Sequence, residues 1–376
     1  MKSNPLSTPI LVVAQSARMI VKLIVDGGLS AVAIDCFADE DTEALNLYQV
    51  ASLRLSDLKP AVDHIIKHFG VTHVVYGSGF ETQVDSLAYL QSRFVIVGNA
   101  VDLFRRFQDK PDFFQTLHQL SIPYPETVFS SPSSHEDWLI KPMQGEGGLS
   151  ISYYQPTSHV DSKRFYWQRY LAGEVFSALF VADAEHVKVL GFNQQWIDQN
   201  HEHAFAFAGI CNQATIGDEN QRLIIEWLTA LIRVYPLHGL GSLDFIFHQG
   251  KFYVLEINAR IPASAQLYGK NVFDLHLQAC NGVRLTVDDK PYPCPIPMGL
   301  QIIYAKHSFK IPMGMIWPNW VVDRPAGGVF IGKGQPVCSI IAQGNNTDKV
   351  QNRLQRWQKI IENLLQTGLY HHAISD

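Results

Sequence analysis

The chain has 376 residues, of which 47% are hydrophobic and 17% are charged. This composition excludes a disordered protein, and the length predicts two or three domains that can each bury a core. The net charge of -5 offers no basic surface for nucleic acid or an anionic membrane, so we expect small-molecule partners.

The five cysteines indicate neither a disulfide framework nor a zinc site. They are odd in number and lack CxxC spacing. We interpret them as ordinary thiols in a reducing compartment and predict a cytoplasmic protein. The apolar run at residues 10–14 is too short for a signal peptide or a membrane span, and Ser16 and Arg18 interrupt it.

The first hundred residues alternate short apolar runs with amphipathic stretches. Strands are predicted at residues 10–14, 31–35, 72–76 and 94–97, with helices at 17–26, 59–69 and 81–91. This rhythm predicts an α/β domain with a doubly wound parallel sheet. A dinucleotide-binding enzyme is the rival interpretation, but the first strand-to-helix turn, Ala14-Gln-Ser-Ala-Arg18, has no glycine to admit a pyrophosphate.

Ligands of such sheets collect at the carboxyl ends of the strands. Ser16 and Arg18 follow the first strand, and Gly77-Ser-Gly-Phe-Glu81 follows a later one, so Ser16, Arg18 and Glu81 are candidate substrate contacts. The structural alternatives are a helix N-cap for Ser16, which we favour, and a tight turn ending at Glu81 in the first helical turn. Both interpretations stay open for Glu81.

A helix is predicted from residue 111 to 120, and Pro123 and Pro125 then break it. The short apolar strand Trp138-Leu-Ile-Lys-Pro142 carries Lys141 toward Gly145, Gly147 and Gly148. Glycines let the backbone turn its amide groups toward an anion, as in phosphate-binding loops. The pattern matches neither GxxxxGK[ST] nor GxGxxG, and a plain turn is the alternative.

Three antiparallel strands are predicted next, at residues 175–183, 187–196 and 205–211. Asp218 then caps a long helix with one apolar stripe, formed by Ile224, Trp227, Leu228, Leu231 and Ile232.

A hairpin at residues 241–260 brings two carboxylates together. If Gln249-Gly250-Lys251 forms a three-residue loop, His248 pairs with Phe252 and Asp244 falls opposite Glu256. Like charges across a ladder are destabilising, and a cation between them removes the objection. With Asn258 they form an oxygen ligand set that suits Mg2+, and Arg260 follows at once. The alternative is a solvent-exposed acidic face or a loop of another length.

After residue 290 the sequence becomes rich in proline, glycine and short strands, beginning with the run from Pro291 to Pro297. We predict a small β-rich subdomain over residues 291–376 that ends in a helix at 347–366.

In this order and spacing, the lysine strand with its glycine loop, the segment Gln168-Arg-Tyr-Leu-Ala-Gly-Glu174 and the acidic hairpin resemble the ATP-grasp superfamily of the carboxylate-amine ligase type. The resemblance covers residues 105–285. It implies a pre-ATP-grasp domain at 1–110, an ATP-grasp domain at 111–290 and a C-terminal subdomain at 291–376. Two motifs depart from the family, which commonly has Gln-Glu at 168–169 and Asn-Pro-Arg at 258–260.

The resemblance also implies roles for individual residues. Lys110 and Lys141 would hold ATP phosphates, and Gly145, Glu146, Gly147 and Gly148 would form a lid over them. Adenine would lie along Gln168, Arg169, Tyr170 and Leu171, with Glu174 on the ribose. Asp244, Glu256 and Asn258 would hold one or two Mg2+, with Mn2+ as an alternative. Arg260 and Lys141 would be catalytic, and Arg260 and Ser264 would contact substrate.

The expected activity is ATP-dependent joining of a carboxylic acid to an amine through an acyl phosphate. A small-molecule kinase and a nucleotide-binding regulator without turnover are the alternatives, and the assembly could be a homodimer. The overall layout is also similar to ligases of one-carbon cofactor synthesis, which couple an aromatic amine or amino acid to glutamate as in methanofuran formation.

Overall fold

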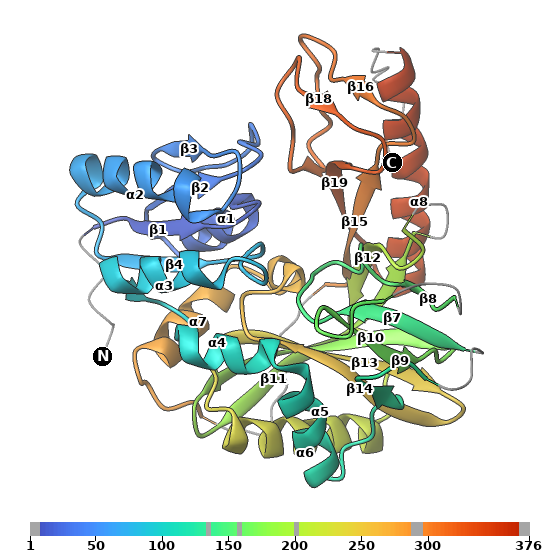
Figure 1. The fold of residues 1–376 in the computed structure, drawn as a ribbon. Helices are drawn as coiled ribbons and strands as arrows, with labels where there is room; N and C mark the ends of the chain where they lie inside the picture. The colour runs from blue at the N-terminus through green and yellow to red at the C-terminus, as the bar shows by residue number, and fades with distance from the viewer. Residues whose placement is uncertain (1–7, 133–136, 156–159, 199–202, 287–295, 368–376) are drawn as a thin grey trace.

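The computed structural model describes residues 8–132, 137–155, 160–198, 203–286 and 296–367. The N-terminal domain, drawn in blue, lies beside a larger body built around a long antiparallel sheet (Figure 1). Most of the proline-rich run at 291–297, including Cys294, lies outside the described residues. The four described cysteines are free thiols.

The N-terminal domain is the predicted doubly wound unit. Its five strands are all parallel and lie in the order β3-β2-β1-β4-β5. The strands are β1 (Ile10–Val13), β2 (Ala31–Asp35), β3 (Leu47–Gln49), β4 (His73–Tyr76) and β5 (Val95–Ile96). The helices are α1 (Arg18–Asp26), α2 (Leu55–Phe69) and α3 (Val84–Arg93). The short edge strand β3 was not predicted, because two half-buried residues and one exposed residue carry too weak a period.

Two short helices lead into a small antiparallel sheet. They are α4 (Val101–Gln108), which was not predicted, and α5 (Lys110–Gln119), which matches the predicted helix. The sheet has the order β6-β9-β7-β8. Its strands are β6 (Thr127–Val128), β7 (Trp138–Pro142), β8 (Ser152–Tyr153) and β9 (Phe165–Arg169).

The large sheet has eight strands in the order β14-β13-β10-β11-β12-β15-β19-β17. The strands are β10 (Glu174–Asp183), β11 (Val187–Ile197), β12 (Phe207–Asn212), β13 (His238–His248), β14 (Lys251–Asn258), β15 (Met298–Tyr304), β17 (Val321–Val322) and β19 (Pro336–Gln343). The predicted run of three antiparallel strands is confirmed as β10, β11 and β12. Because β15 pairs with β12, the C-terminal strands β15, β17 and β19 extend this sheet.

Helices cover the large sheet. Helix α6 (Asp218–Val234) packs its five predicted stripe residues into the core below β10 and β13 (Figure 1). Its N-cap is Gly217 and Asp218 is the first helical residue, so the predicted cap is wrong by one position. Helix α8 (Thr347–Thr367) packs against β15 and β19, and the hairpin-like pair β16 (Phe309–Lys310) and β18 (Phe330–Ile331) lies beyond them.

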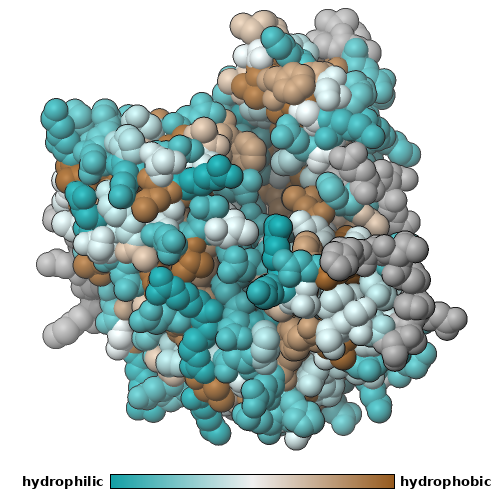
Figure 2. Space-filling view, in the orientation of Figure 1, coloured by the Kyte–Doolittle hydropathy of each residue, from teal (hydrophilic) through white to brown (hydrophobic). Residues whose placement is uncertain are grey.

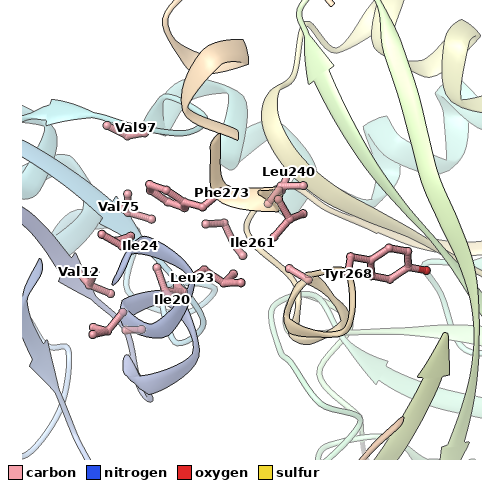
Figure 3. Packing of buried hydrophobic residues seen from close by; sticks show 14 of the residues in the cluster. Val12, Ile20, Leu23, Ile24, Val75, Val97, Leu240, Ile261, Tyr268 and Phe273 are labelled. Atoms are coloured by element: carbon pink, nitrogen blue, oxygen red, sulfur yellow. The ribbon is translucent and has the colours of Figure 1, made fainter. Parts of the chain in front are cut away.

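A continuous apolar core joins the N-terminal domain to the larger body. Val12 of β1 and Ile20 of α1 belong to the same buried cluster as Leu240 of β13 and Phe273 of helix α7 (Val272–Cys280) (Figure 3). The 3-10 helix η1 (Ala263–Leu267) packs between them. This packing sets the carboxyl edge of the parallel sheet against the segment that follows β14. None of the described helices is long and apolar enough to cross a membrane.

Candidate functional site

The hairpin β13–β14 places Asp244 directly opposite Glu256, as predicted. The predicted turn is wrong, because His248 pairs with Lys251 across a two-residue turn at Gln249 and Gly250, both with positive φ. A register shift between Asp244 and Phe245 adds one residue to the facing strand. This bulge compensates for the shorter turn and restores the pairing of the two carboxylates.

The carboxylate of Asp244 is surrounded by polar groups from three strands. Burial and the facing Glu256 raise the pKa of Asp244 to about 7. The side-chain amide of Asn258 donates to Asp244 Oδ2 over 3.2 Å and to Ser242 Oγ over 3.3 Å. Gln195 of β11 also donates to Asp244, over 3.4 Å. Two carboxylates and an amide at this spacing fit a divalent cation, with the remaining ligands left to phosphate oxygens and water.

No group of three or more His, Cys, Asp and Glu side chains in the described parts of the chain could enclose a metal by itself. This agrees with the composition of the hairpin, which has only two acidic ligands. Such a site would be completed by a phosphate-bearing substrate and does not resemble a resident structural metal centre.

Two lysines face the acidic hairpin. Lys141 of β7 donates to Gln168 Oε1 over 3.0 Å. Burial and the nearby charge of Lys110 lower the pKa of Lys141, although Glu256 and Asp244 attract its proton. Lys110 begins α5 and lies beside the same cavity as Glu256. The two predicted phosphate lysines therefore converge on the predicted metal ligands from separate elements.

The glycine loop after β7 closes on the start of β12. Gly147 and Gly148 have φ values of +64° and +72°, which favour glycine. A Cβ on Gly148 would lie 1.9 Å from the carbonyl oxygen of Phe205, so only glycine fits there. The carbonyl of Gly147 accepts from Phe207 N–H over 2.9 Å. The two glycines therefore shape the loop for this close approach.

The predicted adenine segment is the connection between the two antiparallel sheets. Gln168 and Arg169 end β9, and Glu174 begins β10. The Gln168 side chain is buried between Lys141 and Thr127, and the Arg169 guanidinium stacks on Trp138. Leu171 lies in the link itself, and Tyr170 forms an aromatic cluster with Tyr153 and Phe205. Adenine binding by residues 168–171 and ribose binding by Glu174 stay predictions.

Arg260 is held by two glutamates from different parts of the chain. Its Nε donates to Glu81 Oε1 over 2.7 Å, and a terminal nitrogen lies 3.8 Å from Glu146 Oε2. Burial opposes the charge of Arg260, but Glu81 and Glu146 outweigh it and raise the pKa of Arg260. Burial also opposes ionisation of Glu81, and Arg260 outweighs it and lowers the pKa of Glu81. Helix α3 begins only at Val84, so Glu81 does not lie in its first turn.

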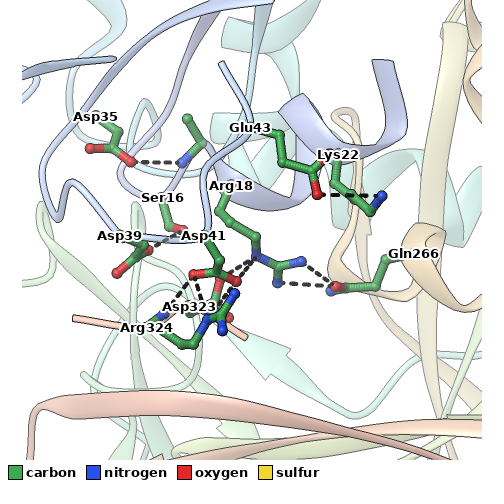
Figure 4. Close-up of polar contacts among 11 residues, drawn as sticks. Ser16, Arg18, Lys22, Asp35, Asp39, Asp41, Glu43, Gln266, Asp323 and Arg324 are labelled. Carbon is green, nitrogen blue, oxygen red and sulfur yellow. Dashed lines mark hydrogen bonds and ion pairs between the residues drawn. The ribbon is translucent and has the colours of Figure 1, made fainter. Parts of the chain in front are cut away.

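Two of the other candidate substrate contacts, Ser16 and Arg18, lie in a polar network between the N-terminal domain and the C-terminal segment (Figure 4). Arg18 donates to Asp323 over 2.8 Å and to Gln266 over 3.1 Å. Ser16 donates to Asp39 over 3.5 Å, and the N-cap of α1 is Ala17, so the favoured cap for Ser16 is wrong. Ser264 is buried, and its hydroxyl has no hydrogen-bond partner in the described structure.

A small cavity lies between the start of α5, the acidic hairpin and Arg260. Its lining includes Glu81, Lys110, Gly145, Glu256, Asn258 and Arg260. A larger cavity of about 410 Å³ lies between β11, β15 and α8. Its described lining includes Gln195, which also bonds Asp244, but no lysine or arginine. Glutamines line much of it, and Gln301 and Gln358 bond each other. We therefore place the chemistry at the smaller cavity, where the charges gather.

Sequence reasoning missed two contributors to the site. Gly79 donates its backbone N–H to both Glu81 and Glu146, over 3.0 and 3.1 Å. A glycine in a turn at a strand's carboxyl end was a usable signal for such a backbone donor. Gln195 could not be found from sequence, because its contact with Asp244 depends on the pairing of three strands.

Comparisons with known proteins agree with this geometry. Residues 107–264 match the sequence profile of the ATP-grasp domain. An uncharacterized protein of Methanocaldococcus jannaschii is 22% identical over 263 residues, or 66% of this chain and 64% of that protein. The carbamoyl phosphate synthase large chain of Clostridium beijerinckii is 21% identical over 56% of this chain and 22% of its own length. The chain thus spans less than two thirds of both relatives.

Two solved structures share the fold over most of both chains. The L-amino acid ligase of Bacillus licheniformis is 12% identical with a TM-score of 0.68, covering 94% of this chain and 97% of that one. The biotin carboxylase domain of Hydrogenobacter thermophilus 2-oxoglutarate carboxylase, solved with MgADP, ADP and bicarbonate, is 12% identical with a TM-score of 0.70, covering 92% and 88%. Residues 107–264 of this chain are therefore similar to an ATP-grasp domain.

Proposed function

We propose that this protein is an ATP-dependent ligase that joins a carboxylic acid to an amine through an acyl phosphate. The observation that carries the proposal is the convergence of Lys110, Lys141, Glu256 and Arg260 near one cavity, with Asp244 paired to Glu256. The proposal is supported by the ATP-grasp match and by the shared fold with an L-amino acid ligase.

Lys141 and Lys110 would bind the phosphates of ATP, since both lie beside the acidic hairpin that would bind the metal. Asp244, Glu256 and Asn258 fit one or two Mg2+, or Mn2+ as an alternative. The ion would neutralise phosphate charge when bound. The loop with Gly145, Gly147 and Gly148 would exclude water from the phosphates.

The proposed reaction has two balanced steps. A carboxylate oxygen of the acid attacks the γ-phosphorus, and the bond to the ADP oxygen breaks. The amine nitrogen then attacks the acyl carbon, inorganic phosphate leaves, and the nitrogen loses a proton. Arg260, oriented by Glu81, would stabilise charge on the transferred phosphoryl group and bind the acid.

A kinase is the main alternative. Phosphoryl transfer to an alcohol needs a base to remove the hydroxyl proton, whereas a carboxylate is already ionised at neutral pH. Glu81, the carboxyl that lies closest to Arg260, accepts from the guanidinium over 2.7 Å and from the N–H of Gly79 over 3.0 Å, so it is not free to act as this base. A nucleotide-binding regulator without turnover would need no group such as Arg260 to stabilise a transferred phosphoryl group. Only the ligase needs an amine as second substrate, so a requirement for an amine distinguishes it from the kinase and from the regulator.

Within the ligases, we keep the coupling of an aromatic amine or amino acid to glutamate, as in methanofuran-type synthesis, as a hypothesis about substrate. A screen for ADP release with ATP, Mg2+ and paired acids and amines tests it directly. A cytoplasmic location, a homodimer and the absence of nucleic-acid and membrane partners stay predictions.

The ligase mechanism is tested with an acid labelled with oxygen-18 in its carboxylate. One labelled oxygen should appear in the released phosphate after amine is added, because the acyl phosphate bridge oxygen comes from the acid. Amide product alongside unlabelled phosphate would refute the acyl phosphate. A phosphorylated product that persists in the presence of amine would favour the kinase.

The metal site is tested by Glu256→Gln, which keeps the shape of the side chain and removes its formal charge. We expect turnover to be abolished at saturating Mg2+ while the fold is retained. Glu226→Gln on the exposed face of α6 is the matched control. Wild-type turnover by Glu256→Gln would exclude the hairpin as the metal site.

A further inference from the structure

Glu146, on the glycine loop, reaches across to the N-terminal domain. Its carboxylate accepts from the backbone N–H of Gly79 over 3.1 Å and lies 3.8 Å from Arg260. Gly79 follows β4, at the edge of the parallel sheet where ligands of such domains collect. A carboxylate of the chain itself is thus held by one fixed backbone donor and one guanidinium.

The contacts of Glu146 are weaker than those of its neighbour. Glu81 approaches Arg260 to 2.7 Å and shares the same Gly79 N–H, so the two carboxylates compete for the same donors. Burial and Glu81 raise the pKa of Glu146 to about 7. The side chain of Glu146 is 26% exposed against 10% for Glu81. Glu146 is therefore the more easily displaced of the two.

We propose that Gly79 N–H and the Arg260 guanidinium form the subsite for the carboxylate of the acid substrate, and that Glu146 occupies this subsite until the acid displaces it. The inference rests on the proposed ligase function and specifies where its acid binds. The two donors come from different domains and converge on one carboxylate group, which is the recognition geometry that a substrate carboxylate needs.

The arrangement links the lid to the acid. Gly145, next to Glu146, lines the cavity with Lys110 and Glu256, so the side chain that the acid displaces belongs to the loop beside the proposed phosphate site. An acid in the subsite would also place its oxygens next to Arg260. The competing possibility is that Glu146 is a permanent structural contact between the two domains, here called a strut.

The test uses acetate, which is a carboxylate headgroup with almost nothing else. Its binding to the nucleotide-free protein without Mg2+ is measured by saturation-transfer NMR of the acetate methyl group. Because Glu146→Ala removes an internal competitor for two charge-assisted donors, we expect the dissociation constant of acetate to fall roughly tenfold. Glu185→Ala, in the exposed turn between β10 and β11, is the matched control and should bind as wild type does.

A second substitution tests whether the gain in acetate affinity depends on Arg260. In Glu146→Ala combined with Arg260→Lys, the gain in acetate affinity should be lost, because lysine keeps the charge but not the planar guanidinium. Unchanged or weaker acetate binding by Glu146→Ala would overturn the inference and make Glu146 a strut. A gain that survives Arg260→Lys would place the acetate elsewhere and overturn it equally. Glu146→Gln serves as the milder variant if the alanine variant unfolds.

Calorimetry with ATP and Mg2+ separates this inference from the function on which it rests. If wild-type protein binds ATP and Mg2+ but Glu146→Ala leaves acetate affinity unchanged, the subsite is wrong and the ligase proposal stands. If wild-type protein binds no ATP, the proposed function fails whatever acetate does.

Discussion

Two arginines with little exposed surface lie at the boundary between the domains, and they differ in what surrounds them. Arg18 has a side chain that is 5% exposed, and Asp323 and Gln266 occupy its nitrogens at 2.8 to 3.1 Å. Arg260 has a side chain that is 15% exposed, with one close glutamate and a second at 3.8 Å, and it lines a cavity. A buried, paired arginine is thus not in itself a sign of chemistry. The incompletely paired edge of Arg260, facing a cavity, distinguishes it.

The structural role of Arg18 is tested by removing its side chain. In Arg18→Ala, Asp323 and its acidic neighbours lose their buried counter-charge, so the free energy of unfolding should fall by about 3 to 5 kcal/mol. Denaturant unfolding measures this. Arg105→Ala removes an exposed ion pair and should cost less than about 1 kcal/mol. Equal midpoints for the two variants would mean that Arg18 does not tie the domains together.

At Arg260 the effect should appear in catalysis. Arg260→Lys keeps the charge and loses the planar donor pair, so turnover should fall by a factor equivalent to about 3 to 4 kcal/mol, while the unfolding midpoint changes little. Steady-state ADP release measures this, with Arg105→Lys as the control. A large loss of stability with full turnover in the folded fraction would make Arg260 a structural arginine like Arg18.

A substitution at Lys141 tests whether ATP binds near Arg260 and the acidic hairpin. Lys141→Ala should weaken ATP binding at least about tenfold, since it removes a charge-assisted contact of roughly 1.5 to 3 kcal/mol. Calorimetry measures the affinity. Lys163→Ala, exposed on the segment before β9, is the control. An unchanged ATP affinity would remove Lys141 from the site.

A further effect concerns the pH dependence of stability. Burial, with Asp323, Asp35 and Asp41, raises the pKa of Asp39 to about 8, and Arg18 opposes the shift. Asp39 therefore stays protonated in the folded protein where the unfolded chain is ionised. Stability should fall as pH rises from the ordinary carboxyl value toward about 8, by at most about 1.4 kcal/mol per pH unit, and then level off.

Asp39→Asn should make this part of the pH profile shallower, because the amide has no proton to lose, while Asp244 and Glu146, whose pKa values are also raised to about 7, still contribute to the slope. Unfolding midpoints between pH 5 and 8 measure the slope, and Asp63→Asn, at an exposed position, should keep the wild-type slope. An identical slope in Asp39→Asn and wild type would show that Asp39 is ionised in the folded protein.

Local pattern determined most of the elements by itself. Apolar runs and glycine stops predicted β1, β2 and β4 to within a residue or so, because strand and helix periods are read directly from neighbouring residues. Gly70, with φ of +59°, ends α2 as predicted. The facing of Asp244 and Glu256 also followed from alternation along a hairpin, although the turn and the bulge each differed from expectation by one residue.

Only the tertiary structure decided which of these side chains meet. Glu81 pairs with Arg260, which is 179 residues away in the sequence, and Arg18 pairs with Asp323, which is 305 residues away. The sequence marked both Arg18 and Glu81 as candidates in the same way, at carboxyl ends of strands. Their roles separated only when the apolar core between the N-terminal domain, η1 and α7 set the sheet edge against the segments bearing Arg260 and Gln266. Short-range periodicity fixes the faces of single elements, whereas pairing across domains depends on how buried surfaces pack, which no local pattern encodes.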